Sequence, residues 1–266
     1  MFDRLKSIFG RPPVASERDY AMPANVRAYA IGDIHGEAKL LHALLDRIVE
    51  DSATLPAAET HLIFLGDYID RGPDSKGVVE LLSRWSRADA NCHFLKGNHE
   101  DALLEIVAGN EDDLPGWLRF GGRQTLASYD ISERAVAMGG PFLRAEFAEK
   151  VPAHHLEFLT GLDMKVELGD YLFVHAGIRP DVAIDQQDDR DLMWIRREFL
   201  NFAGLHPKMI VHGHTISPEV ELQHNRIGVD TGAYASGKLS AVVLEGKERR
   251  TLSTTESDRS RPAQLA

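Results

Sequence analysis

The sequence predicts a layered α/β fold. Short apolar segments alternate along the chain with segments whose apolar residues recur at helical spacing, and this alternation is typical of sheets covered by helices. The 266 residues are 43% hydrophobic and 27% charged, as in ordinary globular proteins. A chain of this length buries a sizeable core without covalent support, and its single cysteine, Cys92, excludes an intrachain disulfide.

The expected elements follow from the apolar pattern in chain order. The segments expected to form strands are 26–32, 61–66, 92–96, 164–174, 208–212, 226–229 and 239–244. Helices are expected over 37–51 and 74–87, where leucine, valine and isoleucine residues recur at a spacing of three and four. Residues 100–162 contain helical patterns and no convincing strand. We therefore expect a helical insertion there, covering one end of the sheet.

The two ends of the chain differ in composition from the rest. We expect an arm or linker over 1–25, one domain over 26–250, and a polar, disordered tail over 251–266. The first residues alternate charged and apolar side chains, so no signal peptide is expected. No apolar run approaches the ~20 residues that a membrane-spanning helix needs, so no transmembrane segment is expected.

Charge and cysteine content limit the partners and the compartment. Lys and Arg total 30 against 41 Asp and Glu, a net charge of −11. This balance argues against binding of a nucleic-acid polymer, because phosphate-backbone contacts need clustered Lys and Arg. The single cysteine favours a reducing compartment, and a cytoplasmic location is expected. The oligomeric state stays open.

Polar residues recur at one kind of place, the end of an apolar segment. Five expected strands run directly into motifs that combine Gly with Asp, Asn or His: GDIHG at 32–36, GDYIDRG at 66–72, GNHE at 97–100, HAG at 175–177 and HGHT at 212–215. In open α/β sheets, ligands bind outside the carboxyl ends of the strands. The five motifs are therefore expected to form one site.

The residue types indicate metal binding. The candidate ligands comprise two carboxylates, one amide oxygen and three imidazoles: Asp33, His35, Asp67, Asn98, His175 and His214. A mixed O and N set without thiolate suits Mn, Fe or Zn better than Ca. Six ligands exceed the needs of one tetrahedral ion and suit two divalent ions that share a bridging carboxylate. Mn is the first expectation, with Fe or Zn as alternatives.

The five motifs in this order resemble those of the calcineurin-like metallophosphoesterases. The GDYIDRG motif resembles the phosphoprotein phosphatase branch, which includes lambda phosphatase and the diadenosine tetraphosphate hydrolases. The resemblance covers about residues 26–245 and implies a layered α/β/β/α sandwich. Lys96 before GNHE and the segment GVDTGAY from Gly228 resemble the bacterial members. Ile216 stands where the wider family has a further His ligand, which leaves water to complete the first metal's shell.

The resemblance also implies a role for each site residue. The first metal would be held by Asp33 and His35, the bridge would be Asp67, and the second metal would be held by Asn98, His175 and His214. His99 matches the general acid, and Asp70 matches the residue that orients it. Arg71 matches one phosphate-binding arginine, and Arg196 is expected to be the second, with Arg197 as the alternative.

The function implied by the resemblance is hydrolysis of phosphate monoesters. A metal-bridging hydroxide would attack phosphorus in line, and the first expected substrate is phosphoserine or phosphothreonine in a protein. The alternative is a symmetrical dinucleoside polyphosphate (diadenosine tetraphosphate) hydrolase acting on a phosphorylated small molecule. A catalytically silent phosphopeptide-binding module is disfavoured, because no ligand is replaced and His99 is present. Trp117, Trp194 and Tyr234 are expected to pack, with the rim of the substrate site as the alternative, and His154 and His155 to be surface or packing residues.

Overall fold

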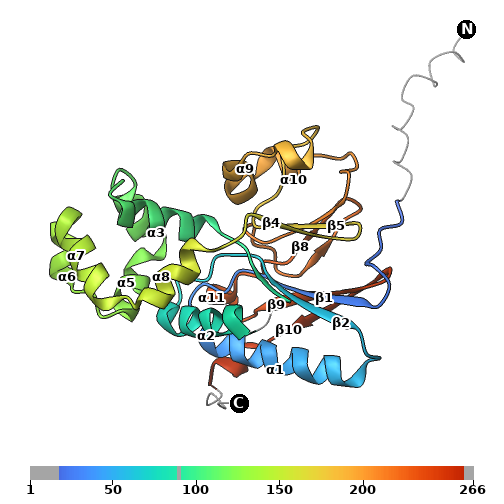
Figure 1. The fold of residues 1–266 in the computed structure, drawn as a ribbon, viewed down its shortest axis with the longest axis horizontal. Coiled ribbons are helices and arrows are strands. Elements are labelled where there is room, and N and C mark those ends of the chain that lie inside the picture. Colours follow the sequence, from blue (N-terminus) through green and yellow to red (C-terminus); the bar gives the residue numbers. More distant parts are fainter. Residues whose placement is uncertain (1–17, 89–90, 261–266) are drawn as a thin grey trace, which may run out of the picture.

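Two five-stranded sheets packed face to face form the centre of the molecule (Figure 1). The computed structural model describes residues 18–88 and 91–260. The strand order of the first sheet is β10-β9-β1-β2-β3, formed by Glu248–Ser253, Ser240–Glu245, Val26–Ile31, Glu59–Phe64 and Cys92–Phe94. The order of the second is β4-β5-β6-β8-β7, formed by Lys165–Leu168, Tyr171–Val174, Met209–His212, Arg226–Gly228 and Glu221–Leu222.

Parallel pairing brings the carboxyl ends of the inner strands to one side of each sheet. β1, β2 and β3 pair in parallel, as do β5, β6 and β8. The remaining strands, β4, β7, β9 and β10, pair antiparallel with their neighbours. The loops that follow β1, β2, β3, β5 and β6 carry the five motifs, so this topology gathers them.

The inner strands β1, β5, β6 and β9 are buried on both faces, which explains why they are apolar at successive positions. On β1, Tyr29 and Ile31 pack toward the helices, whereas Ala28 and Ala30 lie in the apolar layer between the sheets. On β5, Phe173 belongs to the layer between the sheets, and Leu172 packs with Phe199 on the outer face of the second sheet. The side chains thus alternate between two cores, as the pleat of a strand requires.

Helices cover both outer faces, which confirms the α/β/β/α sandwich. α1 (Ala38–Thr54) and α2 (Ser75–Ala88) lie on the first sheet, close to the helices expected over 37–51 and 74–87 (Figure 1). α9 (Asp189–Trp194) and α10 (Arg197–Leu200) lie on the second.

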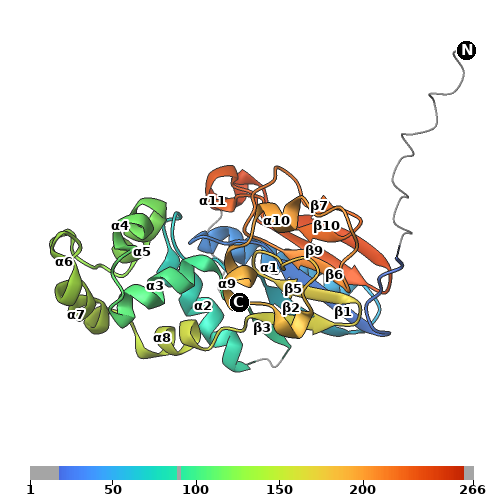
Figure 2. The same ribbon diagram turned by 90° about the horizontal axis from the view of Figure 1, so that it is seen from above.

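The expected helical insertion is present and extends from one end of the sandwich (Figure 2). Within the described residues, no strand lies between β3 and β4. Helices occupy this part of the chain: α3 (Asn98–Ala108), α4 (Leu114–Trp117), a π turn (Leu118–Gly122), α5 (Arg123–Ser128), α6 (Glu133–Met138), α7 (Gly140–Lys150) and α8 (Ala153–Thr160).

Two expectations about strands need correction. The segment 164–174 is a hairpin of β4 and β5, because Gly169, at φ +56°, and Asp170 form a two-residue turn. The tail expected over 251–266 is structured as far as it is described: β10 runs to Ser253, and a 3₁₀ helix follows over Glu256–Ser260. Residues 261–266 lie outside the described residues.

Contacts with α1 explain why the tail is structured despite its polar composition. Arg47 of α1 donates hydrogen bonds to the Ser253 carbonyl and to Asp258, the latter at 2.9 Å. Arg259 donates to Glu37, at 2.7 Å from Oε1. The domain boundary expected at residue 250 therefore falls inside β10.

The expected arm is also part of the domain where it is described. Tyr20 and Met22 are buried in the apolar layer between the sheets, and residues 1–17 lie outside the described part of the chain. The remaining short elements are a 3₁₀ turn over Ile184–Gln186 and α11 (Ala233–Ser236). Among the described helices, none has the length and apolar character to cross a membrane.

Candidate active site

Backbone hydrogen bonds fasten the motif loops to one another. The loop after β1 joins the loop after β2, since the N–H groups of Ile34 and His35 donate to the Asp67 carbonyl at 3.1 and 2.8 Å. The loop after β6 joins that after β5 through Gly213 N–H and the His175 carbonyl at 2.8 Å. These bonds join loops within each sheet. Across the sheets, the His214 N–H donates to Asp33, which brings side chains of both sheets around one point.

Asp67 lies at the centre of the expected ligands, and its two oxygens face different histidines. Oδ2 is 3.5 Å from His35 Nε2, and Oδ1 is 3.5 Å from His175 Nε2. His175 Nε2 is also 3.0 Å from Asn98 Oδ1 and 3.2 Å from His214 Nδ1. The structure thus groups one histidine on one side of Asp67 and two histidines with an asparagine on the other.

The tautomers of two histidines make this centre a cation site. His35 Nδ1 is 2.8 Å from the Ile69 carbonyl, and His175 Nδ1 is 2.8 Å from the Leu65 carbonyl. Because a carbonyl oxygen only accepts, each of the two rings carries its proton on Nδ1. The lone pair of each Nε2 therefore faces an oxygen of Asp67. Burial lowers the pKa of His35 to about 3, which keeps that ring neutral. Lone pairs facing a carboxylate repel unless a cation lies between them.

A group of buried carboxylates leads to the same conclusion. Burial raises the pKa of Asp33 well above its usual range, and the negative charges of Asp230 and Asp67 raise it further. Asp33 accepts the His214 N–H on both oxygens, at 3.1 and 3.0 Å. A Cβ on Gly213 would lie 2.0 Å from Asp33 Oδ1, so this approach requires glycine. The donor set fits two divalent ions bridged by Asp67.

His99 lies beside this centre and is held by Asp70. His99 Nδ1 is 2.6 Å from Asp70 Oδ2, and its Nε2 is 3.1 Å from an Arg71 nitrogen and 3.9 Å from Asp67 Oδ2. Burial opposes the charged imidazolium, but Asp67 and Asp70 outweigh it and raise the pKa of His99. A guanidinium only donates, so Arg71 donates to Nε2 here while the Nδ1 proton is donated to Asp70. Nε2, which faces the metal centre, takes up a proton when the ring becomes charged, and the raised pKa favours that form.

Two residues hold Asp70 by hydrogen bonds that the sequence did not predict. Thr125 Oγ1 donates to Asp70 Oδ1 at 2.6 Å, and Trp117 Nε1 donates to Asp70 Oδ2 at 2.8 Å. Trp117 is buried, as expected, and also bonds to the site. Both residues belong to the helical insertion, whose sequence shows a helical pattern but no sign of which side chain reaches Asp70.

Glu100 is a further residue that the sequence left without a role. Its carboxylate accepts four backbone N–H groups: Asp67 at 2.9 Å, Tyr68 at 2.8 Å, Ile69 at 3.2 Å and Gly97 at 3.0 Å. These bonds fix the loop that carries Asp67. Burial, followed by the Asp67 charge, raises the pKa of Glu100 to about 8, and the N–H donors oppose that rise. The sequence feature that could have indicated a role for Glu100 is its position directly after Asn98 and His99 in the GNHE motif.

Of the two expected phosphate-binding arginines, Arg71 contacts His99, whereas Arg196 affects two histidines of the centre through its charge. Arg71 packs over the ring of Tyr234, 4.8 Å from its centroid, and the same ring meets His35 edge-on at 5.4 Å. Tyr234 therefore lies at the site, in line with the alternative of a rim position and against the preferred packing role. Arg196 has an exposed side chain at the start of α10. Burial is the main cause that lowers the pKa of His175 and His214, and the positive charge of Arg196 adds to it.

The chain belongs to the calcineurin-like phosphoesterase family, whose model matches residues 26–225. It is therefore a metal-binding phosphoester hydrolase of a family with a dinuclear centre. It is 28% identical over 223 residues to "Serine/threonine-protein phosphatase 2" of Escherichia coli, covering 80% of this chain and 90% of the relative. It is 26% identical over 239 residues to "Bis(5'-nucleosyl)-tetraphosphatase PrpE [asymmetrical]" of Oceanobacillus iheyensis, covering 82% and 88%.

Solved structures share the fold. A crystal structure described as that of a candidate diadenosine tetraphosphatase superposes with a TM-score of 0.60 at 23% identity, covering 88% of this chain and 98% of that one. A cold-active protein tyrosine phosphatase superposes with a TM-score of 0.53 at 20% identity, covering 96% and 88%. The named relatives thus include phosphatases of proteins and a hydrolase of a dinucleotide. The dinucleotide hydrolase is named asymmetrical, whereas the sequence suggested a symmetrical one as the alternative.

Proposed function

We propose that the protein is a phosphatase that hydrolyses phosphoserine and phosphothreonine monoesters in proteins. The observation that carries this proposal is the His99–Asp70 pair beside Asp67. An alkoxide is a poor leaving group and needs a proton as the P–O bond breaks, and a histidine with a raised pKa can supply it. A relative named as a serine/threonine-protein phosphatase supports the same substrate class.

The residues around Asp67 would hold the ions. Asp33 and His35 would bind the first ion, Asn98, His175 and His214 the second, and Asp67 both. When bound, two divalent cations of Mn, Fe or Zn type supply Lewis acidity and activate the attacking water.

The remaining side chains act on the substrate. Arg71 and Arg196 would hold the phosphate oxygens, because a guanidinium donates to two oxygens at once. His99 would donate its Nε2 proton to the leaving oxygen. Asp70, fixed by Thr125 and Trp117, would hold the ring in the required orientation.

A second candidate substrate is a dinucleoside polyphosphate. A cavity of about 390 Å³ is lined by Arg71, Lys39 and Tyr234. Its lining also holds Asp74 and the ion pair of Arg259 with Glu37. Cations beside the site suit the additional phosphates of such a molecule. A relative named as a tetraphosphatase supports this candidate.

Assays of both substrates on the Mn-loaded protein separate the candidates. We expect the kcat/KM for a phosphothreonine peptide to exceed that for diadenosine tetraphosphate, and Lys39→Ala to leave peptide hydrolysis unchanged. The reverse preference, together with a loss of dinucleotide hydrolysis in Lys39→Ala, would establish the second candidate. Its products then give the cleavage position: two ADP for symmetrical cleavage, ATP and AMP for asymmetrical.

A further inference from the structure

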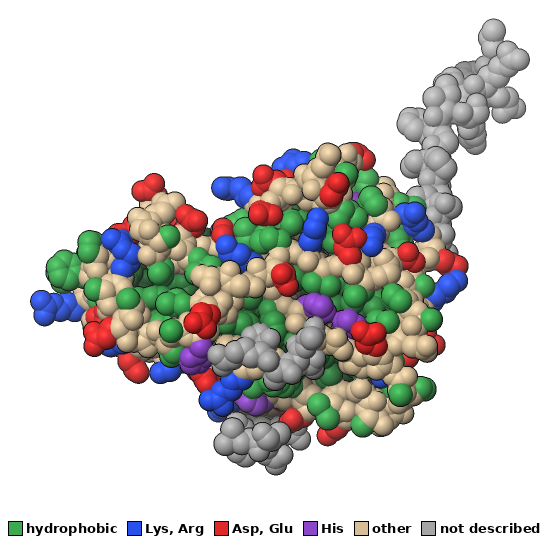
Figure 3. All heavy atoms as spheres, in the orientation of Figure 1, with side chains coloured by type: hydrophobic (Ala, Val, Ile, Leu, Met, Phe, Trp, Pro, Cys, Tyr) green, Lys and Arg blue, Asp and Glu red, His purple; other side chains and the backbone are tan. Residues whose placement is uncertain are grey.

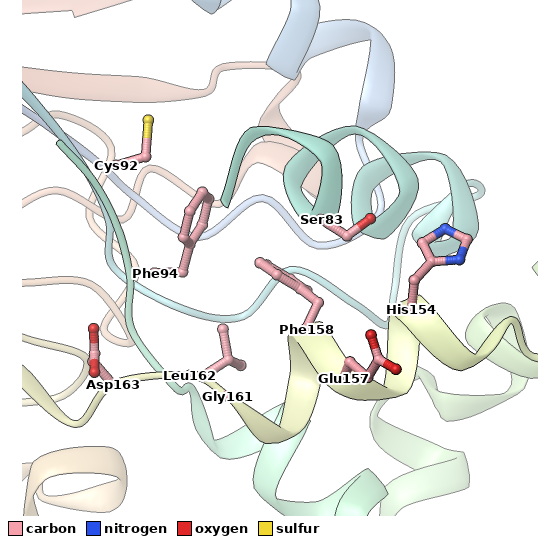
Figure 4. A pocket seen from close by; sticks show the side chains of 9 residues that line it. All are labelled: Ser83, Cys92, Phe94, His154, Glu157, Phe158, Gly161, Leu162 and Asp163. Atoms are coloured by element: carbon pink, nitrogen blue, oxygen red, sulfur yellow. The ribbon is translucent and has the colours of Figure 1, made fainter. Parts of the chain in front are cut away.

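A second cluster of metal-ligand side chains lies between α2 and α8, away from the site around Asp67. His154 Nε2 is 2.9 Å and His155 Nε2 is 2.7 Å from the same oxygen of Glu80, Oε2. The three ligand atoms lie within 4.8 Å of one another. Figure 4 shows His154 at the start of α8 with its ring directed toward α2.

Packing fixes the ring of His155 independently of the carboxylate, and that ring in turn supports the ring of His154. His155 is fully buried, and its ring meets that of His154 edge-on, with centroids 4.4 Å apart. It also contacts Tyr129 edge-on at 5.7 Å. The nitrogens therefore stay directed at one point, and little ordering is needed when a ligand binds there.

Tyr129 fits either protonation pattern of His155. Its hydroxyl is 2.8 Å from His155 Nδ1. Without an ion, the Nε2 proton is donated to Glu80 and Nδ1 accepts from the hydroxyl. With an ion on Nε2, the proton moves to Nδ1 and is donated to the same hydroxyl. Such an outer partner orients a ligating histidine.

Exposure and charge determine what kind of ion fits. The side chains of Glu80 and His154 are 34% and 32% exposed, and a cavity of about 340 Å³ borders His154 (Figure 4), so water can complete the coordination. Arg84 holds the other Glu80 oxygen, Oε1, at 2.6 Å, which leaves Oε2 for an ion. Two imidazoles and one carboxylate oxygen suit Zn²⁺ or Co²⁺ rather than Mg²⁺ or Ca²⁺.

We propose that Glu80, His154 and His155 bind one exchangeable divalent ion of the zinc type, separate from the ions at Asp67. The ion joins α2 to α8 and, through Tyr129, to the end of α5. Since Thr125 of α5 donates to Asp70, the ion stabilises the helices that support His99. The site is thus a positioning element and lies outside the reacting groups.

Zinc stoichiometry tests the site without an activity readout. After equilibrium dialysis against Zn²⁺, wild-type protein is expected to hold one more ion per chain than Glu80→Gln. Gln keeps an oxygen that accepts from both histidines, so this variant is expected to fold. His154→Asn is a second variant on a partly exposed residue and should lose the same ion. Glu157→Gln, an exposed change one turn along α8, is the matched control and should keep it.

Crystals soaked in zinc locate the ion directly. We expect an anomalous peak at the zinc edge between Glu80 Oε2 and the two Nε2 atoms in the wild type and Glu157→Gln, and none in Glu80→Gln. Equal zinc content in the wild type and Glu80→Gln, with no peak between α2 and α8, would overturn the proposal. The proposed function does not depend on this result.

Discussion

At the scale of residues, strained backbone is concentrated at the candidate site. Of the described non-glycine residues with positive φ, five belong to the motifs: His35, Asp67, Asp70, Arg71 and His214. Such conformations cost about 1–3 kcal/mol each and persist only where surrounding contacts fix them. Here the Glu100 bonds to the loop of Asp67 and the Thr125 bonds to Asp70 supply that fixation.

Changing the leaving group tests the role of His99. His99→Asn should reduce hydrolysis of a phosphoserine peptide by ~10²–10⁴-fold, the usual contribution of general acid catalysis. Nitrophenyl phosphate should lose much less, because nitrophenolate leaves without a proton. Rates on both substrates and the metal content would be measured. An equal loss on the two substrates would show that His99 acts through binding or metal organisation.

The placement of the second arginine is tested by two neighbouring variants. Arg196→Ala should lower kcat/KM about tenfold or more, because a charge-assisted contact with phosphate is worth ~1.5–3 kcal/mol. Arg197→Ala, also exposed at α10, is the matched control and should leave kcat/KM near the wild-type value. A silent Arg196→Ala with a damaged Arg197→Ala would move the assignment by one position.

The sequence predicted which residues meet, but it left out those that hold them. Asp33, Asp67, Asn98, His175 and His214 follow strands, and parallel strands bring such positions to a shared edge. Glu100 and Thr125 act through tertiary contacts that no local pattern encodes. The left-handed backbone of His35, at φ 47°, likewise has no sign in the local sequence pattern.

At the scale of elements, an ion pair joins the last strand to the first helix. Arg250 of β10 donates to both oxygens of Asp51 on α1, at 2.8 and 3.0 Å, and Tyr29 donates to Asp51 at 2.7 Å. The hydrogen bonds from Arg250 lower the pKa of Asp51. Burial has the next largest effect and opposes them, but the pKa stays below its usual value. β10 was not expected as a strand, because Arg249 and Arg250 make its sequence polar and their partners lie far along the chain.

This ion pair predicts a pH-dependent stability. A carboxylate with a lowered folded pKa binds fewer protons than in the unfolded chain, where its pKa is about 3.9. Asp51→Asn should therefore cost about 1 kcal/mol of unfolding free energy at neutral pH. The difference in unfolding free energy between the two proteins should shrink as the pH falls below 4. It should vanish once the pH is below the pKa of Asp51 in the folded protein. Urea unfolding at several pH values measures it, with the exposed Asp46→Asn as the control; a deficit that persists in acid would contradict the ion-pair explanation.

At the scale of the whole molecule, charges of both signs mix on the visible surface, whereas carboxylates gather inside. On the face shown in Figure 3, Lys and Arg are interspersed with Asp and Glu. The buried cluster of Asp33, Asp67 and Asp230 carries like charges from loops of both sheets. Cations at the centre would therefore stabilise the contact between the two sheets as well as the site.

Metal removal is thus predicted to weaken the fold. Mn²⁺ added to chelator-treated protein should raise the Tm, since an ion at 100 times its Kd stabilises the native state by about 2.7 kcal/mol. Ca²⁺ should raise it little, because imidazole ligands do not suit it. Asp67→Asn, at the proposed shared ligand, should remove most of the Mn²⁺ effect. Thermal scans measure these changes, and a Tm unaffected by chelation and Mn²⁺ would contradict the prediction.

The position of β1 has a consequence for synthesis on the ribosome. β1 pairs with β2 on one side and with β9 on the other, so one edge of this strand stays open until the end of the chain has emerged. An open apolar edge pairs readily with other chains. His214 and β9 also arrive late, so the nascent chain has neither a closed sheet nor a complete site. Cotranslational protection of this edge would therefore favour recovery of active protein.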